Sequence, residues 1–440
     1  MKIKRLFVFA ISAFIMFSLC GCNLFTADTE EMLQPPSLSG ELAPISKAIE
    51  KAIGTDYTLK YPTNGNYRSA VIQKDINGDG ILEAFAFYSK TEGDTTMMYI
   101  NILCNKSGEW KSVAEQKIVA GGVDRVDFCD LDGDGIEEIL SGWEIYGTSE
   151  MQLAVYSFNQ DILSQRMLQR YSYFCCTDLD EDGKNEIFMI NFNPAENINR
   201  AGLYQLADDG VRELTGCALD GSVKTVNEPL VSTLSNGKPA VYIDEIKGAG
   251  AVTEVLFVDR GTLLNPLLNT ELRENMLTLR SASIMTADIN RDGIVEIPVQ
   301  GPLPSAKKDD TNESLYYTNW CSYNGETLTN QLTAIMNLND GYYIAVPTKW
   351  VGNIAVLKDT EKKIREIYRY NGETEQTGEM LLCIQAVPVK ELDSDKVLYS
   401  DMQEISRSNG TAFICALSDD AVNDGVTLDT VKKNFNLIEQ

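Results

Sequence analysis

The residues best suited to chemistry in this chain are acidic, and they recur in a short loop motif. In residues 130–138 the motif reads DLDGDGIEE, with aspartate at positions 1, 3 and 5, glycine at position 6 and glutamate at position 9. The pattern returns in residues 75–83, 178–186 and 288–296, where asparagine replaces the second aspartate in the first and last copies along the chain. A hard cation such as calcium takes six to eight oxygen ligands, and a tight loop can supply most of them. Four copies in one register therefore predict four metal-binding loops in a repeated architecture.

The residues around each loop indicate strands rather than helices. A helical EF-hand would need a bidentate glutamate at position 12 and an exiting helix. Position 12 is instead Ala86, Ser141, Met189 or Val299. The glutamate is followed by a short apolar run, such as IFMI in residues 187–190, which is typical of a buried strand. Each unit is therefore predicted to contain a strand, a metal loop, a second strand and a hairpin, as in a four-stranded propeller blade.

The spacing of the loops predicts five such units. The loops begin 55, 48 and 110 residues apart, and the last gap is twice the repeat. Residues 232–241 stand where a fourth loop is expected; they keep a glycine but have lost the acids. A hairpin turn follows each unit after about thirty residues, at Gly108, Asp161, Gly210, Gly261 and Gly325. A period near 50 residues is typical of a propeller or a comparable repeat array.

The motif D-x-[DN]-x-D-G-x-x-E at the start of a β-strand resembles the FG-GAP/VCBS repeats of integrin-α-type β-propellers. The resemblance covers about residues 67–335 and implies structural calcium, bound by the side chains of positions 1, 3, 5 and 9 and the carbonyl of position 7. The implied side-chain ligands are Asp75, Asn77, Asp79, Glu83, Asp130, Asp132, Asp134, Glu138, Asp178, Asp180, Asp182, Glu186, Asp288, Asn290, Asp292 and Glu296. The implied carbonyl ligands are those of Ile81, Ile136, Lys184 and Ile294. The integrin family has seven blades, so closure by five blades and closure by five blades plus flanking strands both remain open.

Composition excludes several classes of function. The chain has 440 residues and a formal net charge of -26, from 38 basic and 64 acidic residues. Nucleic acids and anionic membrane surfaces are bound by basic proteins, so neither is an expected electrostatic partner. The chain contains no histidine, which excludes Ser-His-Asp and Cys-His nucleophile sites and HExxH zinc sites. Carboxylate, lysine and tyrosine chemistry remains possible.

The N-terminus predicts export. Lys2, Lys4 and Arg5 precede an apolar run that ends in Leu19-Cys20-Gly21-Cys22. This ending resembles the bacterial lipobox and implies a signal peptide over residues 1–21 and lipidation of Cys22. An ordinary signal peptide and an N-terminal anchor helix are the alternatives. The chain is therefore expected on the extracytoplasmic face of a bacterial cell membrane, attached by its lipid.

Domain organisation follows from these features. Residues 22–43 read as a polar tether, residues 44–66 as a short helix and lead-in, and residues 67–335 as the propeller. Residues 336–440 are predicted to form a small α+β domain. The predicted fold class is mainly β. The layout also resembles VCBS-repeat lipoproteins of Gram-positive bacteria, on its lipobox and on the short segments LQPP (33–36), LKYP (59–62) and EIP (296–298).

Two functions are compatible with this reading. The first is a module that binds a protein or a glycan, and it carries the expectation that the chain is not an enzyme, because no catalytic motif is visible. The alternative is a calcium-dependent polysaccharide lyase or hydrolase on a propeller scaffold. A cluster of lysine, tyrosine or arginine, or a pocket with unassigned carboxylates, would favour the enzyme.

Overall fold

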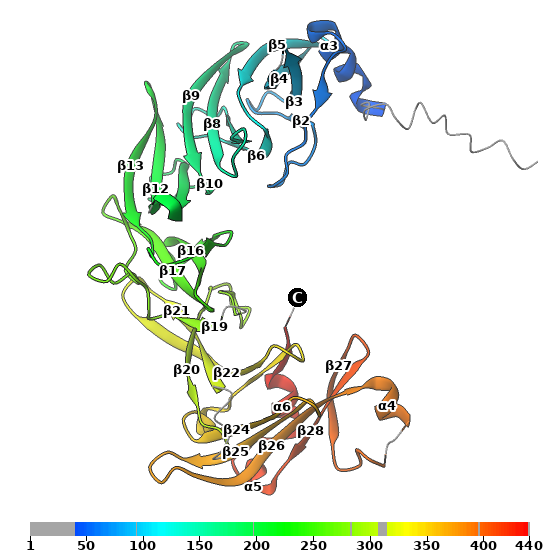
Figure 1. The fold of residues 1–440 in the computed structure, drawn as a ribbon, viewed down its shortest axis with the longest axis vertical. Coiled ribbons are helices and arrows are strands. Elements are labelled where there is room, and N and C mark those ends of the chain that lie inside the picture. Colours follow the sequence, from blue (N-terminus) through cyan, green and yellow to red (C-terminus); the bar gives the residue numbers. More distant parts are fainter. Residues whose placement is uncertain are drawn as a thin grey trace, which may run out of the picture. The chain divides into compact units, whose positions relative to one another are not determined.

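The computed structural model describes residues 40–93, 95–196, 198–281, 284–306, 315–394 and 397–438 (Figure 1). The predicted signal peptide, Cys22 and most of the predicted tether lie outside these residues. No helix within the described ranges is both long enough and apolar enough to cross a membrane. The chain forms two compact units, Met1–Asp130 with Asp134–Gln169 and Leu131–Gly133 with Arg170–Gln440.

The first unit contains two antiparallel sheets and a helix. Its elements are η1 (Gly40–Leu42), α3 (Ala43–Ile53), β1 (Thr58–Leu59), β2 (Val71–Lys74), β3 (Glu83–Glu92), β4 (Thr95–Lys106), β5 (Glu109–Ile118), β6 (Gly122–Cys129), β7 (Glu138–Glu144), β8 (Met151–Asn159) and β9 (Ile162–Tyr171). The first sheet has the order β1-β3-β4-β5 with β2 also paired to β3, and the second has the order β6-β7-β8-β9. Apart from β1, which pairs with β3 and not with β2, strands that neighbour in sequence also neighbour in each sheet, as the predicted units require.

The core of the first unit explains the continuous apolar run at the start of β3. Successive side chains of a strand point to opposite faces of the sheet. Phe85 and Phe87 pack with residues of the second sheet, including Trp143. Residues 84 and 86, both alanines, instead contact the buried face of α3. The helix predicted from residue 44 to residue 54 is confirmed: Gly54 ends it at φ 82° and donates its N–H to the Glu50 carbonyl.

The second unit contains four further sheets. The third sheet is formed by β10 (Tyr173–Thr177), β11 (Glu186–Asn193), β12 (Ile198–Ala207) and β13 (Gly210–Ala218), with η2 (Pro194–Glu196) between β11 and β12. The fourth is formed by β14 (Thr225–Val226), β15 (Leu230–Thr233), β16 (Pro239–Lys247), β17 (Gly250–Asp259), β18 (Thr262–Leu264) and β19 (Arg280–Ser281). The fifth is formed by β20 (Ile297–Leu303), β21 (Leu315–Tyr323), β22 (Leu328–Asn337), β23 (Tyr342–Ala345) and β29 (Phe435–Leu437).

The sixth sheet comes from the C-terminal region. It has the order β24-β25-β26-β28-β27, with β24 (Ile354–Asp359), β25 (Ile364–Asn371), β26 (Gln376–Pro388), β27 (Gln403–Ser408) and β28 (Thr411–Leu417). The helical elements of this region are η3 (Thr348–Trp350), α4 (Val389–Ser394), α5 (Asp419–Asn423) and α6 (Leu428–Asn434). One apolar core joins this region to the fifth sheet, since Ile335 and Ile344 cluster with Val356, Ile384 and Val431.

These elements confirm the predicted fold class at the level of a mainly β chain built from antiparallel sheets. The number of blades and the closure of a propeller remain predictions. The predicted domain boundary at residue 335 falls within β22, and β29 brings the end of the chain back to pair with β23. The fifth sheet therefore contains strands from both sides of that boundary.

Candidate metal centre

The four acidic loops share one backbone geometry. In each, the residue before the motif pairs with the glutamate at position 9, as in Lys74↔Glu83 and Thr177↔Glu186. Cys129↔Glu138 and Ala287↔Glu296 repeat this pairing. The glycine at position 6 has a φ between 82° and 88° in all four copies, which are Gly80, Gly135, Gly183 and Gly293. This left-handed conformation is unfavourable for residues with a Cβ, so the invariant glycine of the motif has a conformational reason.

Backbone N–H groups fix the aspartates of each loop. The N–H of position 6 donates to the first aspartate, at 3.1 Å from Gly183 to Asp178 Oδ2 and 2.8 Å from Gly80 to Asp75 Oδ2. The corresponding distances in the other two loops are 3.0 Å and 2.9 Å. The N–H of position 7 donates to the aspartate of position 5 at 2.8 Å in every copy. The loop backbone thus orients these carboxylates before any ligand binds.

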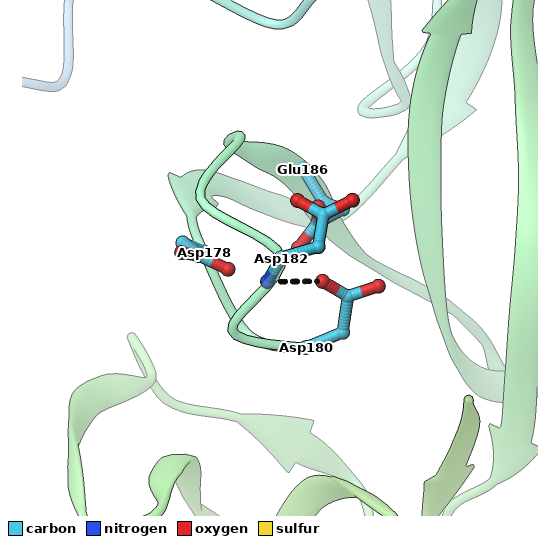
Figure 2. A group of neighbouring side chains, drawn as sticks. All are labelled: Asp178, Asp180, Asp182 and Glu186. Carbon is cyan, nitrogen blue, oxygen red and sulfur yellow. Dashed lines mark hydrogen bonds between the residues drawn. The ribbon is translucent and has the colours of Figure 1, made fainter. Parts of the chain in front are cut away.

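Residues 178–186 gather the most complete set of acids (Figure 2). Asp178, Asp180, Asp182 and Glu186 each offer one oxygen, and these four oxygens all lie within 4.8 Å of one another. Asp178 Oδ1 and Glu186 Oε1 are buried and have no hydrogen-bond partner within the described part of the chain. Converging oxygens that lack donors are the arrangement that a hard cation satisfies. The residues of this loop therefore fit a bound metal ion.

The other three loops differ in how far their acids converge. Residues 130–138 bring together Asp130, Asp132 and Glu138. No comparable group of three acids is found in the described residues of the loops 75–83 and 288–296, where position 3 is asparagine. In the last loop the Asn290 amide donates to Asp292 Oδ2 (2.9 Å) and to Glu296 Oε1 (3.1 Å). The loops 178–186 and 130–138 are thus the stronger candidates for metal binding. The ligand sets of all four loops remain predictions.

The position 9 glutamate of each loop is buried, so its ionised form is unfavourable unless a positive charge lies nearby. Glu186 and Glu296 are fully buried, and desolvation raises the pKa of each to about 7, with smaller contributions from neighbouring carboxylates. Desolvation also raises the pKa of Glu83. Asp75 behaves oppositely, because the Gly80 N–H lowers its pKa. A cation in the loop would compensate the buried negative charge and favour the ionised glutamates.

The fourth unit shows what happens when the acids are lost. β15 and β16 pair at Thr233↔Pro239, so only the five residues 234–238 connect them, whereas eight residues separate Lys74 from Glu83. The shorter turn is closed by Leu234 N–H to the Lys238 carbonyl at 2.8 Å. It contains no acidic residue. The predicted degenerate unit is therefore present as a pair of strands with a tight turn in place of the metal loop.

Replacing Asp178 with asparagine tests the best-formed loop. Asp178→Asn keeps an oxygen for the Gly183 N–H but removes one charge from the group. We expect the variant to bind one calcium ion fewer and to melt at a lower temperature than the wild type in calcium. In EDTA it should melt at the same or a higher temperature, because one repelling charge has been removed. Asp209→Asn is the matched control, because Asp209 is an exposed acid in the β12–β13 turn of the same sheet. An equal loss of stability with and without calcium would show that the loop does not need the metal.

A second acidic cluster was not found from the sequence. Glu245 on β16 and Glu254 on β17 are fully buried. Ile243↔Glu254 pairing puts the two acids diagonally on one face of the hairpin. Glu254 accepts the Asp220 N–H at 3.1 Å and the Asn265 amide at 2.7 Å. Neither carboxyl oxygen of Glu245 has a hydrogen-bond partner within the described residues.

Ionisation of Glu245 and Glu254 is unfavourable inside the protein, because both carboxyl groups are buried. Desolvation is the largest cause that raises the pKa of Glu254, to about 7, and that of Glu245. A nearby carboxylate adds to the shift of Glu245. The sequence carried a signal for this site: both acids sit on a strand face whose other members, such as Val241 and Leu256, are apolar core residues.

A cavity of about 460 Å³ lies in the second unit. Its walls come from β19 to β22 and from β24 and β25, with Gln300 and Tyr316 on one side and Lys358 and Arg365 on the other. Asn339, in the turn after β22, also lines it. None of these residues was predicted as functional, because the cavity exists only once the fifth and sixth sheets meet.

Comparisons with known proteins give little further constraint. No family model and no curated protein matches the chain. Among solved structures, the rhamnogalacturonan lyase YesW is 16% identical, with 73% of this chain and 62% of that chain covered and a TM-score of 0.34. The periplasmic gluconolactonase PpgL of Pseudomonas aeruginosa is 12% identical, with 73% and 87% covered and a TM-score of 0.29. The rhamnogalacturonan lyase PL11 of Bacillus licheniformis is 14% identical, with 71% and 75% covered and a TM-score of 0.31.

These structures require one correction. The chain spans about three fifths of the length of YesW, and no TM-score among the three reaches 0.5, so no particular activity is carried over. The expectation that the chain is not an enzyme is corrected: it rested on the lack of a visible catalytic motif, and the three solved structures reported above are named as enzymes. Its physical basis was also narrow: the absence of histidine excludes imidazole-based sites and leaves lysine, tyrosine and carboxylate chemistry open.

Proposed function

We propose that this chain engages a polysaccharide outside the cytoplasm, on a β-propeller scaffold that calcium stabilises. The observation that supports the calcium part of the proposal is the group of four carboxylates in residues 178–186, in which Asp178 Oδ1 and Glu186 Oε1 are buried without a hydrogen-bond donor in the described residues. The lipobox-like sequence ending at Cys22 supports an extracytoplasmic location, with the chain attached to the membrane by its lipid. Millimolar calcium is available there, and extracellular calcium modules work with Kd values of about 10⁻⁴–10⁻³ M.

Calcium is assigned a structural role in this proposal. Loop acids repel one another when the loop closes, and a divalent cation removes that repulsion. Three of the loops lie between paired strands, as in Thr177↔Glu186, so closing such a loop also fixes the register of the sheet. In this proposal the loop carboxylates bind calcium, and the polysaccharide binds at another site.

The cavity in the second unit is suited to that ligand. Its volume of about 460 Å³ lies within the range of about 300–1,000 Å³ that is typical of small-molecule sites. Gln300 and Asn339 offer amide groups, which both donate and accept hydrogen bonds, as sugar hydroxyl groups do. Tyr316 is 46% exposed and offers an aromatic ring with a polar end. A segment of a polysaccharide matches this mixture of amide and aromatic groups.

Cleavage of the bound polysaccharide is the second candidate function. Lys358 and Tyr316 line the same cavity, and both side-chain types can transfer protons in general acid-base catalysis. This chemistry needs no imidazole, which agrees with the absence of histidine.

A polysaccharide panel tests the proposal. We expect the full mature chain to bind at least one bacterial or plant polysaccharide in affinity electrophoresis, more tightly in 2 mM calcium than in EDTA (roughly the Kd range of extracellular calcium modules). Assay of new reducing ends in the same mixtures separates cleavage from binding. A folded protein that retards in no polysaccharide gel, with or without calcium, would contradict the proposed function.

A further inference from the structure

We propose that calcium binding in residues 130–138 strengthens calcium binding in residues 75–83, so that these two loops fill cooperatively. The inference rests on the calcium-stabilised scaffold of the proposed function and goes beyond it, because it concerns the action of one loop on another. Three kinds of contact carry it: a backbone hydrogen bond, an ion pair and a shared apolar core. All of these contacts join residues of the first unit.

A backbone hydrogen bond joins the two loops directly. Glu137, in the loop 130–138, donates its N–H to the Ile76 carbonyl of the loop 75–83 at 2.8 Å. This N–H belongs to the same planar peptide group as the Ile136 carbonyl, which is an implied calcium ligand. A cation bound to that carbonyl would fix the direction of the N–H and polarise it as a donor. Occupancy of the loop 130–138 therefore strengthens the hold on Ile76.

Ile76 can pass this restraint to the ligands of its own loop. It lies between Asp75 and Asn77, the implied ligands at positions 1 and 3. Its N–H donates to Oε2 of Glu83, the implied ligand at position 9, at 3.2 Å. Its side chain is buried in the apolar core. Holding Ile76 in place thus restricts three of the four implied side-chain ligands.

An ion pair is the second link between the loops. Lys74 Nζ lies 2.8 Å from Glu137 Oε2, and the two side chains are only 26% and 30% exposed. Lys74 precedes Asp75 and is paired with Glu83 in the β2–β3 register. Glu137 stands at position 8, which is not an implied ligand. The pair therefore connects the two loops without using a carboxylate that the metal needs, and partial burial limits its screening by salt.

The apolar core between the two sheets is the third link. Ile76 clusters with Phe85 of β3 and Ile139 of β7, which closely follow the position 9 glutamates of the two loops. The ring of Phe85 also packs on that of Phe128 in β6, with their centroids 4.8 Å apart. Close-packed cores transmit small displacements, because they contain few voids that could absorb them. A change at the start of β7 is consequently transmitted to Ile76.

The loop 75–83 has more to gain from such a restraint. Residues 130–138 already bring three acids within 4.8 Å of one another, whereas the described residues of the loop 75–83 form no such group. The acids of the loop 75–83 must therefore be ordered further when an ion binds, which costs conformational entropy. A neighbouring loop that is already filled removes part of this cost. We expect the loop 130–138 to fill first.

Repulsion between the two divalent ions acts against this coupling. Each ion would be surrounded by the acids of its own loop, and salt at physiological strength screens exposed charges over about 8 Å. The three links act through direct contacts and are not weakened in this way. We therefore expect a net positive coupling of about fivefold in affinity, at the lower end of the range typical of allosteric couplings.

Hydrogen exchange of the full mature chain, followed by mass spectrometry across a calcium titration in about 0.15 M salt, tests the inference. Peptides that cover residues 75–83, 130–138 and 288–296 report each loop separately, by the calcium concentration at half-maximal protection. In Asp130→Asn this midpoint should rise about fivefold for residues 75–83. Asp288→Asn is the matched control, because it makes the same change at position 1 of the last loop, and it should leave the midpoint of residues 75–83 unchanged.

Glu137→Gln tests the ion pair with every implied ligand in place. The variant keeps the backbone hydrogen bond and removes only the pairing with Lys74, so the midpoint of residues 75–83 should rise about twofold. Lys117→Gln is its control, because it breaks the Lys117–Glu92 ion pair at the end of β3 that lies away from Glu83. This control should leave the midpoint unchanged.

An unchanged midpoint for residues 75–83 in folded Asp130→Asn would overturn the inference, and so would an equal rise in Asp288→Asn. If Asp130→Asn does not fold, an unchanged midpoint in Glu137→Gln overturns it instead. In each of these results calcium still protects the loops of the wild type, so the calcium-stabilised scaffold stands. A wild-type chain in which calcium protects none of the loops would instead remove the calcium part of the proposed function.

Discussion

Chelation of millimolar calcium is expected to lower the melting temperature of this protein by about 6 °C. Each loop with a Kd of about 10⁻⁴–10⁻³ M adds on the order of 1 kcal/mol of stability by mass action. Each of the two units contains about two loops, so calcium adds about 2 kcal/mol to each unit, and 1 kcal/mol shifts the melting temperature of a unit of this size by about 2–4 °C. Scanning calorimetry in 2 mM calcium and in EDTA measures the shift, with the calcium concentration chosen roughly from the same Kd range.

Magnesium provides the control for this experiment. Magnesium demands near-octahedral geometry and gives up its water reluctantly, so it should restore little of the lost stability. The calcium effect should also be smaller in Asp178→Asn than in Asp209→Asn. An unchanged melt after chelation would contradict the metal assignment, and equal rescue by magnesium would indicate simple charge screening.

The second large effect expected is a loss of stability as the pH rises through 7. Desolvation, the largest cause, raises the pKa of Glu254 in the folded chain to about 7 from its ordinary value of 4.5, and Glu245 shifts in the same direction. Between these pH values the folded state binds more protons than the unfolded state, so the free energy of unfolding falls as the pH rises. Above about pH 7 the ionised Glu254 carries its penalty, on the order of a few kcal/mol, and the raised pKa of Glu245 extends the loss in the same direction.

The variant Glu245→Gln distinguishes the contribution of Glu245 and Glu254 to the pH dependence of stability from that of other titrating groups. Glutamine fills the same volume, carries no charge and can donate to Glu254, so the variant should exceed the wild type in stability at pH 8 and match it near pH 5. Asp220 and Lys247 face the same cluster and are paired at 3.0 Å, so the variant leaves that ion pair in place. Urea unfolding is measured for wild type and variant at the same calcium concentration and pH, so the titration of the loop glutamates, which both proteins share, cancels in the difference. Identical pH profiles for wild type and variant would show that the pair does not share a buried proton.

Features governed by local backbone rules could be predicted from the sequence. The glycine at position 6 of each loop is needed because φ lies near +85°, and a motif of that kind is visible without a structure. The helix that ends at Gly54 and the hairpin turns of the repeats belong to the same class. In each case the residues that decide the conformation are within about ten positions of one another.

Features that depend on distant segments could not be predicted. The pairing of β29 with β23 joins residues about 90 positions apart, and nothing in the last strand announces its partner. Lys358 and Arg365 become paired cations facing a cavity only when β24 and β25 adopt their register and the fifth sheet covers them. The motif also treats asparagine and aspartate at position 3 as equivalent, whereas the Asn290 amide donates to the neighbouring acids and changes the character of its loop.

The most direct test of the central claim is the number of calcium ions that the purified chain binds in equilibrium dialysis at millimolar calcium. The geometry of the loops predicts between two and four ions per chain, with those in residues 178–186 and 130–138 held most firmly. Elemental analysis of the wild type beside Asp178→Asn should show one ion fewer in the variant. A folded wild-type chain that binds no calcium at millimolar concentration would contradict the account.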